Sequence, residues 1–167
     1  MIRLLAMTDA DFGWLLGEAD RGDALRLCDG GIAPAEVLAM LRGVTAGVAA
    51  TAIAPVAWTI VEDDLVVGMV SFTKRGADGC YELGYGVAPA YQGRGVMTQA
   101  IAALLPIARA DGHRGLTAET SIANPASQQV LRANGFVSVG ERDDPEDGPL
   151  VTWTIDLVEE VAMELRA

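Results

Sequence analysis

The feature that most constrains the fold of this chain is the stretch from Tyr81 to Met97, which reads YELGYGVAPAYQGRGVM. Alternation of apolar and polar residues up to Val87 predicts a β-strand, and a proline-containing loop follows it. Gly93 and Gly95 then predict a tight turn, and apolar residues at helical spacing beyond the turn predict an α-helix. This order is typical of folds in which an anionic ligand lies at the amino end of the helix.

The glycine-rich turn has the composition of a phosphate site. Because Gly93 and Gly95 lack a Cβ atom, the backbone can point successive N–H groups at one spot, which is also the positive end of the helix dipole. Gln92 and Arg94 add side-chain donors. No Gly-Lys-Ser/Thr follows, which excludes a P-loop, and Thr98 stands where a dinucleotide-binding turn has its third glycine. On its own, the turn also fits an ordinary strand-to-helix connection.

The rest of the chain predicts an α+β fold with a mixed, mainly antiparallel sheet around a central β-α-β unit. The 167 residues are expected to form a single domain, 1–167. Two stretches, 45–55 and 142–149, are predicted connections, and Pro106 is expected to kink or end the regular part of its helix. The predicted strands are 2–6, 56–61, 65–73, 80–87, 116–121, 136–141 and 151–157, and the predicted helices are 8–18, 34–44, 96–111, 124–135 and 158–166.

Two motifs resemble the GNAT superfamily of N-acetyltransferases. Gln92-Gly-Arg-Gly95 is similar to its acetyl-CoA pyrophosphate motif, Gln/Arg-x-x-Gly-x-Gly/Ala, and the segment from Asn124 to Phe136 resembles its Asn-x-x-Ser…Gly-Phe segment. The helix and strand expected between them make the pair more specific than either motif alone, and the resemblance covers about residues 56–141. It is closest to the branch of the ribosomal-protein N-terminal acetyltransferases. It implies a GNAT-like fold with splayed central strands.

The resemblance implies a role for each matching position. Backbone groups from Val87 onward would bind the pantetheine arm of acetyl-CoA, and the Val87 N–H would stabilise the oxyanion of the thioester carbonyl. Asn124 and Ser127 would reach the pantetheine or the region of the sulfur, and Arg132 would neutralise the ribose phosphate. The pyrophosphate would be surrounded by Gln92, Gly93, Arg94, Gly95, Val96 and Met97.

The implied reaction is direct attack of an amine on the thioester, which needs a base and a proton for the departing thiolate. Glu82, on the strand of the first motif, is the candidate base, with Glu119 in reserve; both also fit surface positions on strands. Leu131 stands where many relatives carry the tyrosine that protonates the thiolate, so Ser127 or solvent is assigned that step. Met97 stands where the motif prefers Gly or Ala.

Composition and charge restrict the partners. A formal net charge of −11 argues against nucleic acid, whose phosphates need clustered Lys and Arg. Basic residues outnumber acids only between Lys74 and Arg132, so this part can take an anionic ligand, whereas the acidic segment Glu141–Asp147 either attracts a cationic amine or is a solvated surface. No apolar stretch is long enough for a membrane span. Cys28 and Cys80 lack paired metal spacing, which predicts no metal site and a reduced, cytoplasmic protein. For the oligomeric state, the sequence leaves monomer and homodimer open.

These patterns predict an acyltransferase that moves an acetyl group from acetyl-CoA to a primary amine, either a protein N-terminus or a small molecule. The absence of a tyrosine at Leu131 keeps one alternative open, a catalytically silent acetyl-CoA-binding sensor or interaction module. A nucleotide-binding oxidoreductase fits the spacing of the glycine turn poorly.

Overall fold

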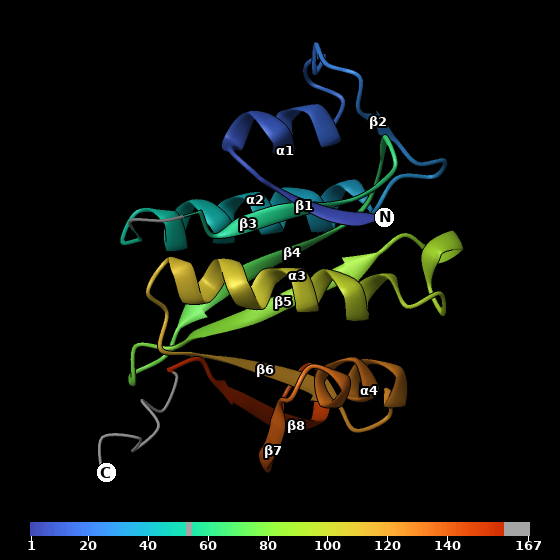
Figure 1. Cartoon of the computed structure of the whole chain (residues 1–167). Coiled ribbons are helices and arrows are strands. Elements are labelled where there is room, and N and C mark those ends of the chain that lie inside the picture. Colours follow the sequence, from blue (N-terminus) through green and yellow to red (C-terminus); the bar gives the residue numbers. More distant parts are fainter. Residues whose placement is uncertain (53–54, 159–167) are drawn as a thin grey trace, which may run out of the picture.

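A computed structural model describes residues 1–52 and 55–158, which form one mixed sheet with helices on both faces (Figure 1). The described strands follow the order β1-β3-β4-β5-β6-β8-β7, and β2 pairs with β4 outside this path. The strands are β1 (Ile2–Ala6), β2 (Arg26–Leu27), β3 (Ala57–Glu62), β4 (Leu65–Arg75), β5 (Tyr81–Val87), β6 (Gly115–Ser121), β7 (Val137–Asp144) and β8 (Gly148–Asp156). The helices are α1 (Asp9–Leu15), α2 (Ala35–Ala49), α3 (Val96–Ala110) and α4 (Pro125–Ala133), with a 3-10 turn at Pro89–Tyr91.

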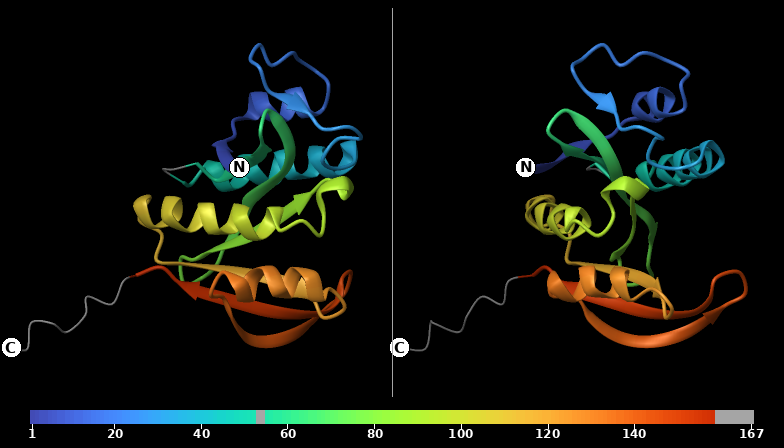
Figure 2. Two further views of the ribbon diagram at one scale, coloured as in Figure 1. Left: turned by 45° about the vertical axis from the view of Figure 1, so that its right-hand side comes forward. Right: turned by 90° about the vertical axis from the view of Figure 1, so that its right-hand side faces the viewer.

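The sheet separates two helical layers, so each sheet face has its own environment. Figure 2 shows α3 on one side of β4 and β5 and α2 on the other, with α1 beside α2. We call these the α3 face and the α2 face. The half of the sheet formed by β6, β8 and β7 carries α4 on the α3 face, whereas no described helix covers its α2 face (Figure 2).

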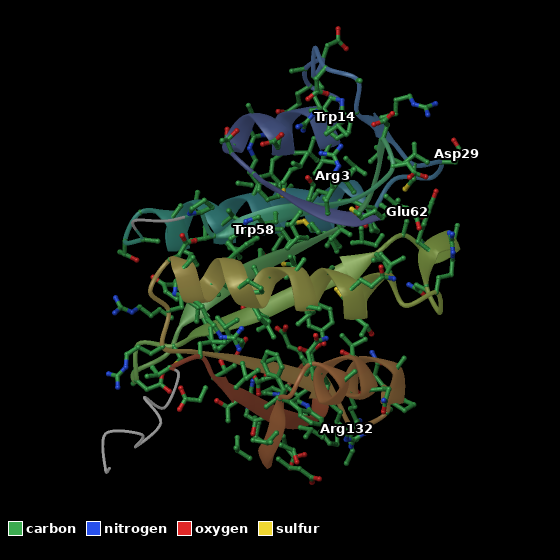
Figure 3. The ribbon with its side chains drawn as sticks, viewed as in Figure 1. Arg3, Trp14, Asp29, Trp58, Glu62 and Arg132 are labelled. Carbon is green, nitrogen blue, oxygen red and sulfur yellow. The ribbon has the colours of Figure 1, made fainter. Side chains whose placement is uncertain are left out.

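The core lies mainly on the α3 face. Trp58, Phe72 and Ile101 are at most 2% exposed, and the rings of Trp58 and Phe72 meet edge to face with centroids 5.3 Å apart. Trp58 is labelled in Figure 3, where it lies just above α3 in the view. Burial of side chains of this size contributes about 1.5–3 kcal/mol each, which fixes β3 and β4 beneath the helix. The packing against α3 therefore fixes the positions of β3 and β4.

The predicted fold class is confirmed, and so is the central β-α-β unit. β5 and β6 are parallel neighbours joined through α3, whereas the β1–β3, β3–β4, β4–β5, β6–β8 and β7–β8 pairs are antiparallel. The helix predicted over 96–111 is confirmed as α3, which continues past Pro106 to Ala110. Buried Leu104, Leu105 and Ala108 anchor the helix on both sides of the proline, which offsets the lost hydrogen bond.

Two predicted connections are occupied in part by regular structure. The stretch 45–55 was predicted as a connection, but α2 continues through it to Ala49. The segment 142–149 was predicted as a loop, yet β7 reaches Asp144 and β8 begins at Gly148, leaving a tight hairpin. The predicted strand 136–141 is part of β7, but its extension through Arg142, Asp143 and Asp144 is charged and shows no apolar alternation. The predicted helix 158–166 lies outside the described residues except at its first position.

Gly68 allows β4 and β5 to approach closely next to the site. A Cβ atom at Gly68 would lie 2.4 Å from the Gly86 carbonyl oxygen and 2.9 Å from Val87 Cγ1. We expect Gly68→Ala to lower the free energy of unfolding by about 1–3 kcal/mol in urea denaturation, because the strands must separate. Gly86→Ala is the matched control, since a Cβ there meets no atom within 4 Å. Equal losses in both variants would contradict this account of Gly68.

Candidate active site

The site begins where β5 and β6 separate. These parallel strands pair only through Tyr81–Leu83 and Leu116–Ala118, so the last four residues of β5 have no partner on that side within the described chain. Beyond Leu83 the two strands are splayed, as the family resemblance implied. A splayed parallel pair leaves backbone donors and acceptors open inside the sheet, where an extended ligand can complete the hydrogen bonding.

Strand parity determines which groups of β5 face this gap. The N–H of Ala88 donates to the Val67 carbonyl at 2.8 Å, and Gly68 pairs with Val87 one position earlier. Because hydrogen-bonded and non-hydrogen-bonded pairs alternate in an antiparallel ladder, Gly84, Gly86 and Ala88 bond to β4. The N–H groups of Tyr85 and Val87 therefore point away from β4 and into the gap.

The glycine turn lies just beyond the end of β5. Gly93 and Gly95 have φ angles of +71° and +75°, and Gly95 is the N-cap residue of α3. A Cβ at Gly93 would meet no atom within 4 Å, so the turn is open on its outer side. The first N–H groups of a helix have no intrahelical acceptor. The Gln99 N–H donates to the Gly95 carbonyl at 3.1 Å, which is the first hydrogen bond of α3. The turn thus offers the donors and the dipole that a phosphate requires.

The side chains of the turn are held by nearby groups. Arg94 is half exposed, its Nη2 lies 3.6 Å from Glu62 Oε2, and its guanidinium lies 5.0 Å from the centre of the Tyr91 ring. Glu62 is labelled at this end of the sheet in Figure 3. Gln92 Nε2 donates to the Val87 carbonyl at 3.5 Å, which ties the turn to the end of β5. An exposed ion pair of this kind is weak, so Arg94 can turn toward an anion at little cost.

A cleft of about 310 Å³ joins these parts, and we call it the cofactor cleft. It runs from Val87 past the glycine turn to the first turn of α3 and is closed by α4. Among the predicted cofactor residues, Val87, Gln92, Gly93, Gly95, Val96 and Met97 line it. Residues absent from the sequence prediction also line it: Tyr91, Thr98, Ala126, Gln129 and Val130.

The amino end of α4 carries two of the predicted residues. The Asn124 side chain caps the helix, accepting from the Ser127 N–H at 3.1 Å. Ser127 Oγ lies 2.7 Å from the Tyr85 hydroxyl, so this pair bridges β5 and α4 next to the cofactor cleft. Burial raises the pKa of the Tyr85 hydroxyl, which therefore stays protonated. Leu131 is fully buried and has no hydroxyl. In this structure a tyrosine hydroxyl next to Ser127 is supplied by Tyr85 of β5 instead.

Arg132 lies apart from the cofactor cleft. Its guanidinium lies 5.2 Å from the centre of the Trp153 ring, a cation–π contact at the carboxyl end of α4. In Figure 3 it projects below α4, away from α3. The structure does not bring Arg132 together with the glycine turn, and the cleft is bounded instead by Ala126, Gln129 and Val130 of the same helix.

Glu82 lies on the α2 face, in the part of β5 that still pairs with β6. It pairs with Thr117 of β6, its carboxylate lies 3.4 Å from Lys74 Nζ, and it accepts from the Thr73 hydroxyl, also at 3.4 Å. With a rise of about 3.3 Å per residue, Glu82 is roughly 16 Å along the strand from Val87 but only about 10 Å from Tyr85. On this face the Thr73 side chain covers Gly84, where a Cβ would lie 2.7 Å from the Thr73 methyl group, whereas the space over Gly86 is open.

Glu119, the reserve base, is engaged in an ion pair. Arg142 reaches across β8 from β7 and donates to both of its carboxylate oxygens, at 2.5 and 2.7 Å, and to Asp144 at 3.2 Å. The hydrogen bonds from Arg142 lower the pKa of the Glu119 carboxyl, which makes it a weaker proton acceptor. Glu119 and Arg142 therefore act as a clamp between β6 and the β7–β8 hairpin.

This clamp predicts a pH-dependent stability. Because the folded-state pKa of Glu119 is lowered, the pair stabilises the fold above the ordinary glutamate pKa of about 4.3 and loses that contribution as the pH falls through the folded value. We expect Glu119→Gln to cost about 1 kcal/mol at pH 7 and nothing at about pH 2.5, measured by urea unfolding. Glu141→Gln, at an exposed position on β7, should change neither value. A loss that is equal at both pH values would contradict the prediction.

A second cavity lies on the other face of β5, and we call it the α2 chamber. Its volume is about 250 Å³. Ile32, Val37 and Leu41 line it from the helical side. A neighbouring cavity of about 410 Å³ shares Ile32 and Ala33 with the chamber, and it shares Val87 and Gln92 with the cofactor cleft. The end of β5 is thus the common wall of a cofactor cleft on the α3 face and a chamber on the α2 face.

The remaining candidate groups do not join this site. His113 lies beyond the far end of α3, packed edge to face on Phe72 and Tyr81, and Cys80 lies at the opposite end of β5 from Val87. Within residues 1–52 and 55–158, no group of three or more His, Cys, Asp or Glu is arranged to hold a metal ion. Among the described helices, none is both long and apolar enough to cross a membrane.

The open parallel strand pair beside the glycine turn of α3 is the arrangement that the sequence resemblance implied. Comparison with known proteins names the class of protein. Residues 2–137 match the family described as the acetyltransferase (GNAT) domain. A ribosomal-protein-serine acetyltransferase of Escherichia coli is 31% identical over 83 residues, or 48% of this chain and 46% of that protein. The chain therefore spans less than half of this curated relative.

Solved structures agree with this result at the level of fold. An acetyltransferase from Salmonella typhimurium, described as modifying the N-terminal serine of ribosomal protein L7/L12, superposes with a TM-score of 0.66 at 18% identity, covering 93% of this chain and 94% of the other. A putative acetyltransferase of the same organism, solved with acetyl-CoA, gives a TM-score of 0.62 at 20% identity and 96% coverage of both. The chain belongs to the GNAT acetyltransferase family, which confirms the resemblance found in the sequence.

Proposed function

We propose that this protein transfers an acetyl group from acetyl-CoA to a primary amine by direct attack in a ternary complex. The observation that carries the proposal is the shared wall formed by the end of β5, with a cleft for the donor on the α3 face and a chamber on the α2 face. The two reactants would meet across this strand. Holding them together supplies most of the acceleration, since a thioester reacts readily with a neutral amine.

The donor would be bound largely by backbone groups. The diphosphate would lie against the N–H groups of Gly93, Gly95 and the first turn of α3, with Gln92 and Arg94 as side-chain partners. The fit is supported by the open outer side of Gly93, where a Cβ atom would have no neighbour within 4 Å, and by the size of the cofactor cleft. The pantetheine arm would continue along the unpaired edge of β5 toward Tyr85.

The thioester carbonyl would accept from the N–H of Val87 or of Tyr85. Both N–H groups point into the gap between β5 and β6, fixed by the ladder with β4 before any ligand arrives. Fixed donors aimed at a developing oxyanion act without reorganisation, which is where such groups contribute most. The sequence resemblance indicated only Val87; the parity of the ladder adds Tyr85.

The amine would lose its proton to Glu82 through water. If the carbonyl lies at the Tyr85 N–H, Glu82 is about 10 Å away along the strand, and its side chain spans part of that distance. The open space over Gly86 leaves room for water, and the Thr73 hydroxyl, which donates to Glu82, lies on the strand beside Gly84. The hydrogen bonds of Arg142 to Glu119 make Glu119 the weaker candidate.

The departing thiolate would take a proton from Ser127. Ser127 lies on the α3 face, opposite the amine, and its hydroxyl is hydrogen-bonded to the protonated Tyr85 hydroxyl at 2.7 Å. The pair can pass a proton toward the sulfur while Asn124 holds Ser127 in place through the helix cap. Base and acid would then work from opposite faces of the same strand.

Release of free thiol tests the proposal. The protein would be mixed with acetyl-CoA and a panel of primary amines, including a peptide with a free N-terminus, since the curated relative is named for a ribosomal-protein serine. Thiol release that depends on the amine, with the acetylated product identified by mass spectrometry, is the expected result. Stabilisation of the protein by acetyl-CoA without turnover of any amine would overturn it.

A further inference from the structure

We propose that the α2 chamber selects acceptor amines that carry an apolar side group, an inference that rests on the proposed function and narrows its substrate class. On the sheet side the chamber is lined by Met69, Ser71 and Gly86. None of its lining residues is charged. The neighbouring cavity, which shares Ile32 and Ala33 with the chamber, is lined by Val87 at the proposed reaction site.

The shape of the chamber follows from the glycines of β5. Gly84 and Gly86 face α2 from the strand, and a Cβ at Gly86 would meet no atom within 4 Å. A side chain at Gly86 would fill the space between β5 and the residues Val37 and Leu41 of α2, whereas a Cβ at Gly84 would lie 2.7 Å from the Thr73 methyl group. At about 30 Å³ for each water molecule, the volume of about 250 Å³ corresponds to about eight waters, enough for a side group the size of leucine or phenylalanine.

The chemistry of the walls determines which group fits. Ser71 is 2% exposed and supplies a hydroxyl among surfaces that are otherwise mostly apolar or backbone. A second ammonium group placed there would be desolvated without an opposite charge, which is strongly unfavourable. An aliphatic or aromatic group instead gains from leaving water. The acidic residues that give the chain its net charge of −11 lie outside this space, so they attract amines at long range but do not select the buried group.

The acceptor class is therefore a primary amine that carries an apolar side group. This chemistry occurs in two sources, a peptide whose first residue is large and apolar and a free arylalkylamine. The structure of the chamber makes no distinction between them, because both present the same groups to Val87 and Met69. Two arms of the experiment separate the sources.

The first measurement is kcat/KM on matched acceptors. The peptide arm compares Phe-Ala-Ala with Ser-Ala-Ala, and the small-molecule arm compares phenethylamine with 1,4-diaminobutane. We expect the apolar member of at least one pair to be preferred by about 10-fold or more, the size of effect that a few methylene groups have in an apolar pocket. The arm with the larger preference shows whether the acceptor is a peptide N-terminus or a free arylalkylamine. Equal values within both pairs, or a preference for the diamine, would overturn the proposal.

Variants test the assignment to the chamber. Gly86→Val places a side chain in open space and should remove the apolar preference, while acetyl-CoA affinity changes less than about 2-fold. Gly140→Val is the matched control on the exposed strand β7, where a Cβ meets Thr152 at an ordinary 3.6 Å, and should keep the preference. Val37→Asp, at a half-buried position, should shift the preference toward the diamine. A preference that survives both chamber substitutions would overturn the proposal.

A binding measurement separates this inference from the proposed function. Phenethylamine would be titrated by calorimetry into the protein saturated with coenzyme A, where no reaction occurs. Binding that is lost in Gly86→Val supports the chamber even if no amine is turned over, a result that would contradict only the proposed function. Absence of binding to the saturated wild type, or equal binding by Gly86→Val, would overturn the chamber inference whether or not amines are acetylated.

Discussion

Gly95→Asp is expected to weaken acetyl-CoA binding by about 100-fold or more, the largest effect of any single substitution in the cofactor cleft. Gly95 has a φ of +75°, a conformation that costs other L-residues about 1–2 kcal/mol. The new carboxylate would also lie at the positive end of α3, where it competes with the diphosphate and repels it. A 100-fold loss corresponds to about 2.7 kcal/mol, within reach of these two effects together.

Calorimetric titration with acetyl-CoA measures this effect directly. Gly112→Asp is the matched control: Gly112 has a φ of +87°, no atom within 4 Å of a Cβ position, and lies just past the other end of the same helix. It should suffer similar backbone strain yet bind acetyl-CoA with nearly unchanged affinity. If the two variants bind equally well, the glycine turn is not the phosphate site.

Val87→Pro is expected to lower kcat by about 100- to 1,000-fold, the usual effect of removing one oxyanion donor. Proline lacks the N–H, and in β5 this N–H points into the gap and takes no part in the ladder with β4. The strand pairing should therefore survive the substitution. Acetyl-CoA affinity should change less than about 10-fold, because the diphosphate site is elsewhere.

Single-turnover thiol release with saturating acetyl-CoA gives the relevant rate. Val87→Ala is the control, since it shortens the side chain but keeps the N–H, and it should retain most of the activity. Thermal unfolding of both variants checks that the proline has not disrupted the sheet. Equal rates in the proline and alanine variants would remove Val87 as the oxyanion donor and leave the Tyr85 N–H in that role.

The sequence predicts the first half of the site well because its information is local. A strand with alternating apolar residues, a glycine pair and an amphipathic helix follow one another without interruption, so the β5–α3 unit and the turn at Gly93 and Gly95 can be predicted from periodicity and φ preference alone. The N-cap of α4 at Asn124 is equally local, because its side chain accepts from the Ser127 N–H three residues later.

The other half depends on contacts between residues that are distant in the sequence. The Tyr85–Ser127 hydrogen bond joins residues 42 positions apart, and the clamp of Glu119 and Arg142 joins residues 23 apart across an intervening strand. The extension of β7 beyond Glu141 is charged and mostly exposed, so it has no apolar pattern in the sequence. Nothing in the neighbouring sequence predicts that the Tyr85 hydroxyl lies next to Ser127, or that Glu119 is paired with Arg142.

The alternation of hydrogen bonds along β5 also restricts how this protein can change. If β5 slipped by one residue against β4, the amides of Gly84 and Gly86 would face the cosubstrate, and the aromatic rings now packed under α3 would turn toward α2. Inserting or deleting an odd number of residues in the hairpin at Gly76–Gly79 invites such a slip, unless burial of Tyr81 and Leu83 holds the strand in place. The length of a surface turn, far from any substrate, thus decides which atoms of the backbone are available for catalysis.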